Sequence, residues 1–258
     1  MIGFLIKKVF FDIWDNLMMI IVTNLGFLAP LALILLSGFL ADYSVAASVA
    51  VLVISVLVFS LYSLGINATV FGYSRYRRDG FRAFKEAFRY HLGHAFFHFG
   101  LCIILVLLFA AVIPFYFAIG NFFGLFMGMT VFWIALIVFL AMQFFFPLCF
   151  HVEADGPFKT FKKCFLVAGD NFGTSLFLFL RTIIDMLLTI LTATMIPGFT
   201  GIALSRMDTM KLLMKKYDFL DANPNLTKKD LNWEDLLFEE RELVGPRSLK
   251  GMIFPWKD

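Results

Sequence analysis

Hydrophobic and polar positions are separated on the scale of whole membrane crossings. No Asp, Glu, Lys or Arg occurs from Tyr43 to Ser74 or from Tyr90 to Phe150, and about 20 apolar residues are enough to cross a bilayer as a helix. The pattern predicts spans near residues 17–40, 44–73, 93–118, 124–149 and 172–194, with a shorter, weaker one near 197–214. We therefore expect an all-α fold, a polytopic transmembrane helical bundle of about six spans arranged as hairpins.

Composition supports this reading. Hydrophobic residues make up 60% of the chain and charged residues only 16%, against roughly 25% charged in soluble domains. The first apolar stretch is too long for a signal-peptide core and lacks a convincing small-residue cleavage site, so we expect it to be retained.

The basic residues fix a predicted orientation. Four groups of lysines and arginines can all lie on one side of the membrane, and the loops on the opposite side then contain none. The groups are Lys7 and Lys8, Arg75 to Arg89, Lys159 to Lys163, and Lys215 with Lys216. The positive-inside rule makes that side the cytoplasm and requires the sixth span. We expect a transmembrane domain over residues 1–217, an acidic cytoplasmic tail over 218–258, and both termini in the cytoplasm.

A short pattern occurs twice between apolar stretches, at residues 79–85 and 155–162. Its phenylalanines recur at i, i+3 and i+7, on one helix face, beside cationic residues. The residues are Phe81, Arg82, Phe84, Lys85 and Phe88 in the first copy and Phe158, Lys159, Phe161, Lys162 and Phe165 in the second. We interpret the copies as amphipathic elbow helices joining parallel hairpin repeats. Each elbow either anchors in the lipid interface or docks a cytoplasmic partner.

Two charged residues lie inside the fifth predicted span. Arg181 and Asp185 are four residues apart, a spacing that lets them pair on a helix. Charges in hydrocarbon are costly and face protein or water. The pair either locks this helix against its neighbours or serves a substrate- or proton-linked role, to which only Arg206 and Asp208 could add.

Histidines at the start of the third span have a spacing that can converge on a metal. His91, His94 and His98 fall at i, i+3 and i+7, but no carboxylate accompanies them, so a further ligand would have to come from elsewhere, such as His151 or Glu153. We favour hydrogen-bonded histidines. No catalytic motif is present and the cysteines form no CxxC pair, so we expect no enzyme activity, metal, cofactor or nucleic-acid partner.

Small and aromatic residues mark two further contact surfaces. Gly120, Gly124 and Gly128 repeat every four residues at the start of the fourth span and predict close helix packing. Contact within the chain is favoured over a second copy, and a homo-oligomer stays open. The tail carries apolar anchors that pack either under the chain's own elbows or onto a partner: Trp233, Leu237, Phe254 and Trp256.

Three segments of the chain form a recognisable set: Asp15-Asn16 through Asn24 and Pro30, then Gly65-Ile66-Asn67-Ala68-Thr69, then the elbow with Phe81 and Phe84. Together they resemble the YesL-like family of small bacterial membrane proteins, a family of unknown function. The resemblance implies a bacterial cytoplasmic membrane and, through members encoded beside carbohydrate ABC importers, an accessory role in sugar uptake with transporter subunits as partners.

Two functions follow as hypotheses. The first is a non-enzymatic accessory or scaffold protein, indicated by the paired elbows and the anchor-rich tail. The alternative is a small self-contained membrane transporter that uses Arg181 and Asp185.

Overall fold

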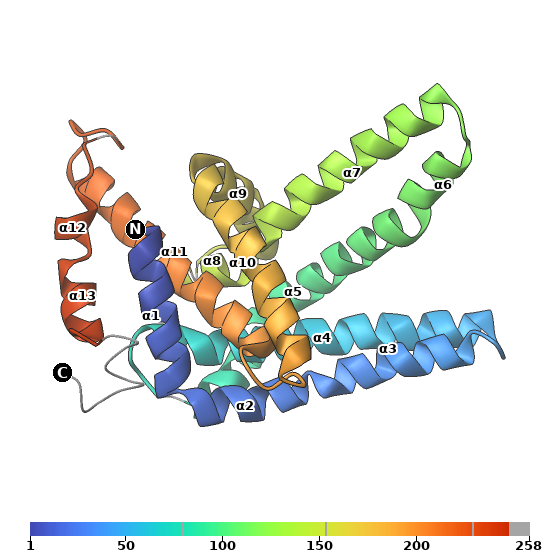
Figure 1. The fold of residues 1–258 in the computed structure, drawn as a ribbon, viewed down its shortest axis with the longest axis horizontal. Coiled ribbons are helices and arrows are strands. Elements are labelled where there is room, and N and C mark those ends of the chain that lie inside the picture. Colours follow the sequence, from blue (N-terminus) through green and yellow to red (C-terminus); the bar gives the residue numbers. More distant parts are fainter. Residues whose placement is uncertain (79, 153, 229, 248–258) are drawn as a thin grey trace.

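The computed structural model describes residues 1–78, 80–152, 154–228 and 230–247 (Figure 1). Helices and their connections account for this part of the chain, and no strand occurs in it, which confirms the predicted all-α fold. Within these residues, five helical segments are long and apolar enough to cross a membrane: Leu17–Leu40, Val45–Ser74, Gly80–Ala118, Phe122–His151 and Phe172–Leu191.

The first hairpin follows a short N-terminal helix. After α1 (Ile2–Asp15), the first span is formed by α2 (Leu17–Gly26) and α3 (Leu28–Leu40), and α4 (Val45–Ser74) returns beside it (Figure 1). The interruption of the first span leaves polar groups to satisfy in an apolar setting. Ser55 of α4 donates to the carbonyl of Pro30 at 2.7 Å and thereby joins the two helices.

The second hairpin is also built from interrupted helices. Its outgoing arm is α5 (Gly80–Leu107), a π-helical turn over Leu108–Val112, and α6 (Ile113–Ala118). Its returning arm is α7 (Phe122–Met142) followed by α8 (Phe145–His151).

The predicted glycine stripe packs inside this second hairpin. A Cβ on Gly124 would lie 2.4 Å from the Tyr116 carbonyl oxygen, and one on Gly128 would lie 2.7 Å from the Phe117 ring. Gly120 sits in the turn with φ of 71°, a conformation that glycine adopts without strain. The stripe therefore brings α7 against α6 of the same chain.

The third hairpin differs from the prediction. It consists of α9 (Pro157–Asp170), α10 (Phe172–Leu191) and α11 (Gly198–Ala222), and α11 is not among the five apolar spans. Charged side chains such as Arg206, Asp208 and Lys211 make α11 too polar to face lipid. Contacts from α1, α2, α4, α8 and α10 surround it instead. The short sixth span that the sequence predicted is therefore not one of the long apolar helices.

Each hairpin begins with an elbow, and each elbow ends at a residue with similar non-helical backbone angles. Asn16 (φ −117°, ψ 19°), His91 (φ −123°, ψ 16°) and Asn171 (φ −127°, ψ 46°) interrupt the helix between elbow and span. At two of the breaks the asparagine amide donates back to the carbonyl four residues earlier, at 2.9 Å for Asn16 and 3.0 Å for Asn171. Helix α1 is thus a third elbow, alongside the two that the sequence pattern indicated.

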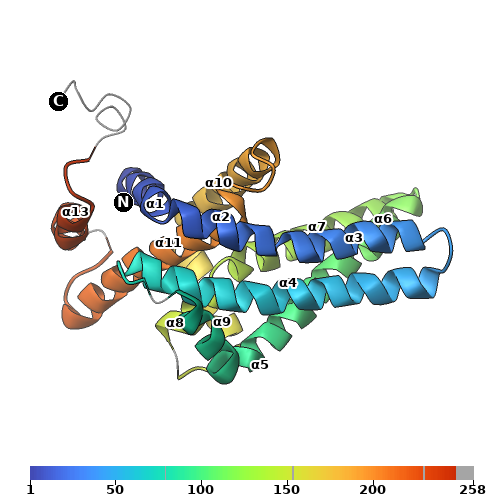
Figure 2. The ribbon, with the colours of Figure 1, turned by 90° about the horizontal axis from the view of Figure 1, so that it is seen from below.

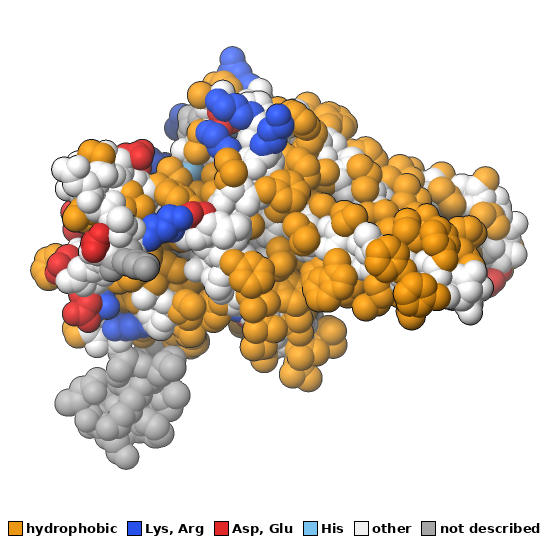
Figure 3. Space-filling view, turned by 90° about the horizontal axis from the view of Figure 1, so that it is seen from above, with side chains coloured by type: hydrophobic (Ala, Val, Ile, Leu, Met, Phe, Trp, Pro, Cys, Tyr) orange, Lys and Arg blue, Asp and Glu red, His pale blue; other side chains and the backbone are white. Residues whose placement is uncertain are grey.

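The core and the charged surface lie toward the same end of the molecule. Fully buried Leu64, Ile66, Phe145, Leu204 and Met207 join α4, α8 and α11. The arms of the first two hairpins extend away from this region (Figure 2). Lysine, arginine and acidic side chains gather over the elbows and tail, whereas the arms are covered by apolar side chains (Figure 3).

Candidate functional site

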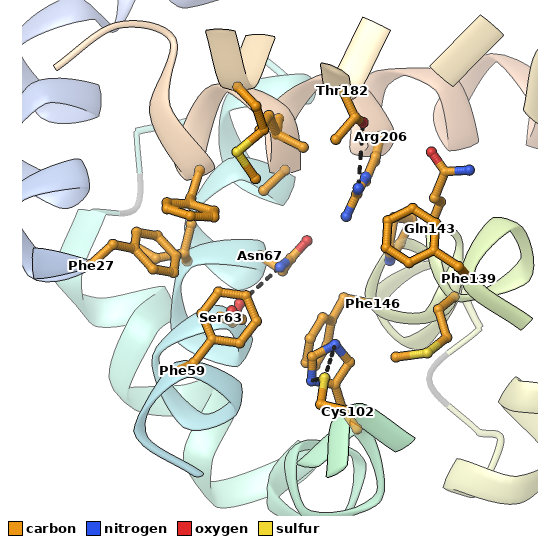
Figure 4. Close-up of a pocket in the computed structure, with 18 of the residues that line it drawn as sticks. Phe27, Phe59, Ser63, Asn67, Cys102, Phe139, Gln143, Phe146, Thr182 and Arg206 are labelled. Atoms are coloured by element: carbon orange, nitrogen blue, oxygen red, sulfur yellow. Dashed lines mark hydrogen bonds between the residues drawn. The ribbon is translucent and has the colours of Figure 1, made fainter. Parts of the chain in front are cut away.

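A cavity of about 210 Å³ lies at the centre of the bundle. All five apolar spans and α11 contribute to its wall (Figure 4). The breaks that separate α2 from α3 and α7 from α8 lie at the wall, at Phe27 and Gln143. The interrupted helices therefore place side chains and turns around one enclosed space.

Arg206 supplies the cationic group of the cavity. It extends from α11 into the space, and its Nη2 donates weakly to Thr182 Oγ1 of α10 at 3.4 Å (Figure 4). Its Nε is buried and, within the described residues, has no hydrogen-bond partner. Buried polar groups are normally paired by protein, water or ligand, so the packing leaves an unsatisfied donor on a residue that lines the cavity.

Two amides face the same space from other helices. Gln143 donates its Nε2 to the carbonyls of Leu140 and Ser175, each at 3.3 Å, while its Oε1 is buried without a partner in the described chain. Asn67 of α4 donates to the Ser63 carbonyl at 2.8 Å, and its amide lies across the cavity from Arg206 (Figure 4). The site thus combines a cationic donor with neutral polar groups.

The remaining wall is apolar and continues into a second space. A groove of about 440 Å³ runs between the first two hairpins and shares Phe27, Phe59, Phe139 and Phe199 with the central cavity. Its outer wall includes exposed apolar side chains of the arms, such as Leu31, Ile34 and Phe109. The polar centre is therefore connected along apolar walls to the lipid-facing surface.

The predicted pair in the fifth span forms but does not line the cavity. Arg181 Nε lies 3.3 Å from Asp185 Oδ2 on α10. Asp185 also attracts Arg206 electrostatically. The pair therefore lies outside the cavity wall, and Arg206 takes the position in the cavity that the sequence had suggested for Arg181.

The structure divides the predicted histidine face. His98 lines the cavity, where its Nδ1 is 3.1 Å from Ser60 Oγ and 3.6 Å from Cys102 Sγ. His91 and His94 lie near the break in α5, close to Cys149 of α8. The sequence indicated the histidines but gave no sign of the cysteine, because α8 is far from α5 along the chain.

The elbow phenylalanines have two different environments. Phe81 and Phe158, the first of each copy, are 59% and 61% exposed. The later ones are half-buried against the core: Phe84, Phe88, Phe161 and Phe165. The cationic residues Arg82, Lys85, Lys159 and Lys162 are exposed. Each elbow thus presents one aromatic ring among cations and uses the other two for packing.

A buried ion network joins α1, α11 and the tail. Lys8 Nζ lies 2.5 Å from Asp12 Oδ2 and 3.1 Å from Asp208 Oδ1. Its neighbour Lys211 lies 2.8 Å from Glu240 Oε1, and the Tyr76 hydroxyl is within 3.3 Å of Lys8 and 3.5 Å of Glu240.

Burial and like charge shift the titration of this network. Burial and the neighbouring Asp208 carboxylate raise the pKa of Asp12 to about 8. Burial also raises the pKa of Tyr76 to about 12. For Glu240 burial acts upward, but the hydrogen bond and charge of Lys211 outweigh it and lower its pKa.

The tail helices α12 (Trp233–Leu236) and α13 (Phe238–Val244) pack on the chain's own elbow end. Leu237 is fully buried with Leu5, Val9 and Leu212, and Trp233 packs against this cluster. Phe254 and Trp256 lie outside the described residues. The tail is thus held by an apolar anchor and by Glu240.

The fold and the cavity together indicate a helical membrane protein with a mostly apolar cavity at its centre, lined by one arginine. Comparison of the chain with protein-family models, with curated proteins and with solved structures finds no match. The site must therefore be understood from its own chemistry.

Sequence reasoning reached part of this site. Arg206 was noted only as an addition to the Arg181 and Asp185 pair, and neither Asn67 nor Gln143 was singled out as a binding group. A signal for Gln143 existed, because it is a strongly polar side chain in a long stretch without any charged residue.

Proposed function

We propose that this protein is a small membrane transport protein that binds an amphiphilic anion in its central cavity. The single observation that carries the proposal is the buried Arg206 guanidinium, which lines the cavity and whose Nε has no hydrogen-bond partner among the described residues. Buried ionisable groups within membrane segments commonly mark substrate pathways. The alternative hypothesis drawn from the sequence is kept, with Arg206 in place of the Arg181 and Asp185 pair as the binding group.

The chemistry of the walls supports an amphiphile over a fully polar solute. Arg206, Gln143 and Asn67 are polar groups of the cavity wall, with Asn67 across the space from Arg206, and aromatic and aliphatic side chains form most of the rest. The adjoining groove is almost wholly apolar and lies along the lipid-facing arms. A solute with an anionic head and a short apolar body would place each part against matching groups.

Equilibrium binding of octanesulfonate to the full chain in lipid nanodiscs tests this proposal. This probe has a permanently charged head and a short chain, so it does not cross a bilayer as a neutral acid. Arg206→Gln should weaken binding about 10–100-fold, because a hydrogen bond to a charged group contributes about 1.5–3 kcal/mol. The neutral analogue octanol should bind to wild type and to this variant with equal affinity.

Two matched substitutions give the experiment its contrast. Arg82→Gln changes an arginine that is exposed on the elbow and should bind as wild type does. Arg181→Gln tests the sequence-based site and should retain most of the binding, since Arg181 does not line the cavity. Equal binding by Arg206→Gln and wild type would exclude the cavity as the anion site. Uptake of labelled octanesulfonate into proteoliposomes then tests transport.

An accessory role is a second proposal, supported by a separate observation. Phe81 and Phe158 project from the two elbows beside exposed cations, an arrangement suited to an acidic amphipathic partner or to anionic lipid. The YesL-like resemblance, with its bacterial cytoplasmic membrane and carbohydrate importer, belongs to this proposal and stays a prediction.

Alanine substitution of the exposed pair tests the accessory role. Phe81→Ala with Phe158→Ala should reduce crosslinking to co-purified transporter subunits while the protein still inserts. The packed residues Phe84 and Phe161 are unsuitable for this test, because their loss would disturb the core. Unchanged partner recovery from native membranes in the double variant would leave the exposed rings as membrane anchors.

A further inference from the structure

A cluster of metal-binding side chains lies away from the central cavity. His91 and His94 of α5 and Cys149 of α8 each offer a ligand atom, and these atoms all lie within 4.8 Å of one another. His94 and Cys149 are buried and His91 is half-buried. Their residues come from two helices that the fold brings together, so the cluster is a product of tertiary structure.

The geometry points to a Zn²⁺ site formed by His91, His94 and Cys149, and we propose it as a binding site distinct from the anion cavity. Zn²⁺ takes imidazole nitrogen at about 2.0–2.1 Å and thiolate sulfur at about 2.3 Å. A tetrahedral ion with those bond lengths separates its nitrogen and sulfur ligands by about 3.5 Å. His91 Nδ1 and Cys149 Sγ are 3.3 Å apart, close to that separation before any ion is present.

Thr160 of the second elbow orients one of the ligands. Its Oγ1 lies 3.2 Å from the Gly156 carbonyl, to which it donates, and 3.3 Å from His94 Nε2. A hydroxyl that donates its one proton to a carbonyl accepts from the imidazole, so the proton of neutral His94 is held on Nε2. With the proton on Nε2, zinc would bind through the other ring nitrogen, Nδ1, and Thr160 would be the outer-shell partner that metal-binding histidines generally have. The His94 ring also hydrogen-bonds to the Asp155 backbone.

The backbone break at His91 places this ligand where an ion can reach it. His91 lies at the edge of a surface cavity of about 650 Å³ that also involves Arg77, Arg82, Glu86 and Tyr90. Glu86 accepts from Arg82 at 2.9 Å and offsets its charge at the entrance. The cavity gives an aqueous route from the elbow surface to His91, the outermost member of the cluster.

Three protein ligands leave a fourth position for water or another small ligand, as in exchangeable rather than purely structural zinc sites. An ion bound here would clamp α5 at its break to α8, next to the Thr160 contact from α9. The site would thereby fix the position of the first elbow relative to the second hairpin.

Zinc stoichiometry of the full chain purified in detergent tests the site. Protein is equilibrated with Zn²⁺, desalted, and analysed by elemental mass spectrometry, and affinity is measured by competition with a chromophoric chelator. Wild type should retain about one zinc per chain. Thr160→Val should weaken affinity about 10–100-fold, and Cys149→Ser should weaken it more.

Matched controls come from a cysteine and a histidine of α5, the helix that carries His91 and His94. Cys102→Ser and His98→Gln change residues that lie outside the cluster and should keep wild-type affinity. Arg206→Gln should keep it as well. Binding that survives Cys149→Ser unchanged, or folded wild-type protein that retains no stoichiometric zinc, would overturn the proposal.

Co²⁺ loading of the wild-type protein gives a readout that needs no variant. A thiolate ligand produces a sulfur-to-cobalt charge-transfer absorption, which is expected here even if Cys149→Ser folds poorly. A cobalt spectrum without that absorption would show that the cysteine is not a ligand and would overturn the site as proposed.

Discussion

Two buried cations in this protein have opposite surroundings. Lys8 lies between two carboxylates, at 2.5 Å from Asp12 and 3.1 Å from Asp208. Arg206 lines a cavity and makes one weak hydrogen bond, at 3.4 Å, to Thr182. Its buried Nε has no hydrogen-bond acceptor among the described residues. A buried cation that is paired with nearby carboxylates has a structural role, because it joins helices. A buried cation that lines a cavity without such a pair is a candidate for binding an anionic ligand.

The Lys8 network joins segments that are far apart in the sequence. Lys8 and Asp12 belong to α1, Asp208 and Lys211 to α11, and Glu240 to the tail. Removing one partner of a buried ionic group leaves an uncompensated charge, while its net contribution as an intact group is often small. The network therefore fixes how the three segments meet more than it adds to overall stability.

The largest predicted effect is on the Lys8 network. Lys8→Met leaves Asp12 and Asp208 buried without their cation and should reduce the free energy of unfolding by about 3–5 kcal/mol. Thermal unfolding of the purified protein in one detergent measures this change. The control is Arg82→Gln in the exposed Arg82 and Glu86 pair, which should change stability by about 0.5 kcal/mol or less.

Equal unfolding temperatures for these two variants would contradict the comparison. If Lys8→Met is too unstable to purify, the triple variant with Asp12→Asn and Asp208→Asn removes the uncompensated charges and should recover much of the loss.

The next effect concerns the tail. Leu237 is fully buried, and its neighbour Phe238 is 60% exposed. Leu237→Ala should weaken tail docking by about 2–5 kcal/mol, as for other buried leucines, and limited proteolysis of the segment before α12 should accelerate. Phe238→Ala is the matched control and should be cleaved as wild type is. Similar cleavage of both variants would show that Leu237 does not anchor the tail.

The sequence predicted the hairpins well because long uncharged stretches have few other structural solutions. Asn16, His91 and Asn171 show what it predicted less well. The breaks at these residues separate elbows from spans, yet only two elbows carry the repeated phenylalanine pattern, and α1 was recognised only through its position and geometry.

The cavity was harder to predict than the fold because it depends on which helices meet. Arg181 and Asp185 carry a clear local signal, since their spacing allows pairing within one helix. Arg206, Asn67 and Gln143 come from different helices and converge only through packing. The same holds for His91 and Cys149, whose proximity no local pattern records.

A smaller predicted effect is a pH dependence that isolates the Lys8 network. Burial and Asp208 raise the pKa of Asp12 from its ordinary value of 3.8 to about 8. Between those values the folded state keeps a proton that the unfolded state has released, so stability falls as the pH rises through this window. Glu240, with a lowered pKa, loses its contribution only as the pH falls into the acidic range.

Melting temperatures from about pH 5 to about pH 9 measure this dependence. Asp12→Asn should flatten the decline, because it removes the titrating group. Asp15→Asn is the control. Asp15 is an exposed residue at the end of the same helix, where it pairs with Arg247, and its replacement should leave the decline in place. A slope that persists in Asp12→Asn would assign the titration to another group.

The smallest predicted effect on stability is at Arg206. This prediction is the most direct test of the difference between Arg206 and Lys8. Arg206 attracts Asp185, but Asp185 keeps its own partner, Arg181, at 3.3 Å when Arg206 is replaced. Arg206→Gln therefore leaves no uncompensated buried charge, and the free energy of unfolding should change by less than about 1 kcal/mol. Thermal unfolding beside Lys8→Met in the same detergent measures this. A loss as large as that of Lys8→Met would make Arg206 a structural cation, whereas a small loss together with weakened octanesulfonate binding separates its role from that of Lys8.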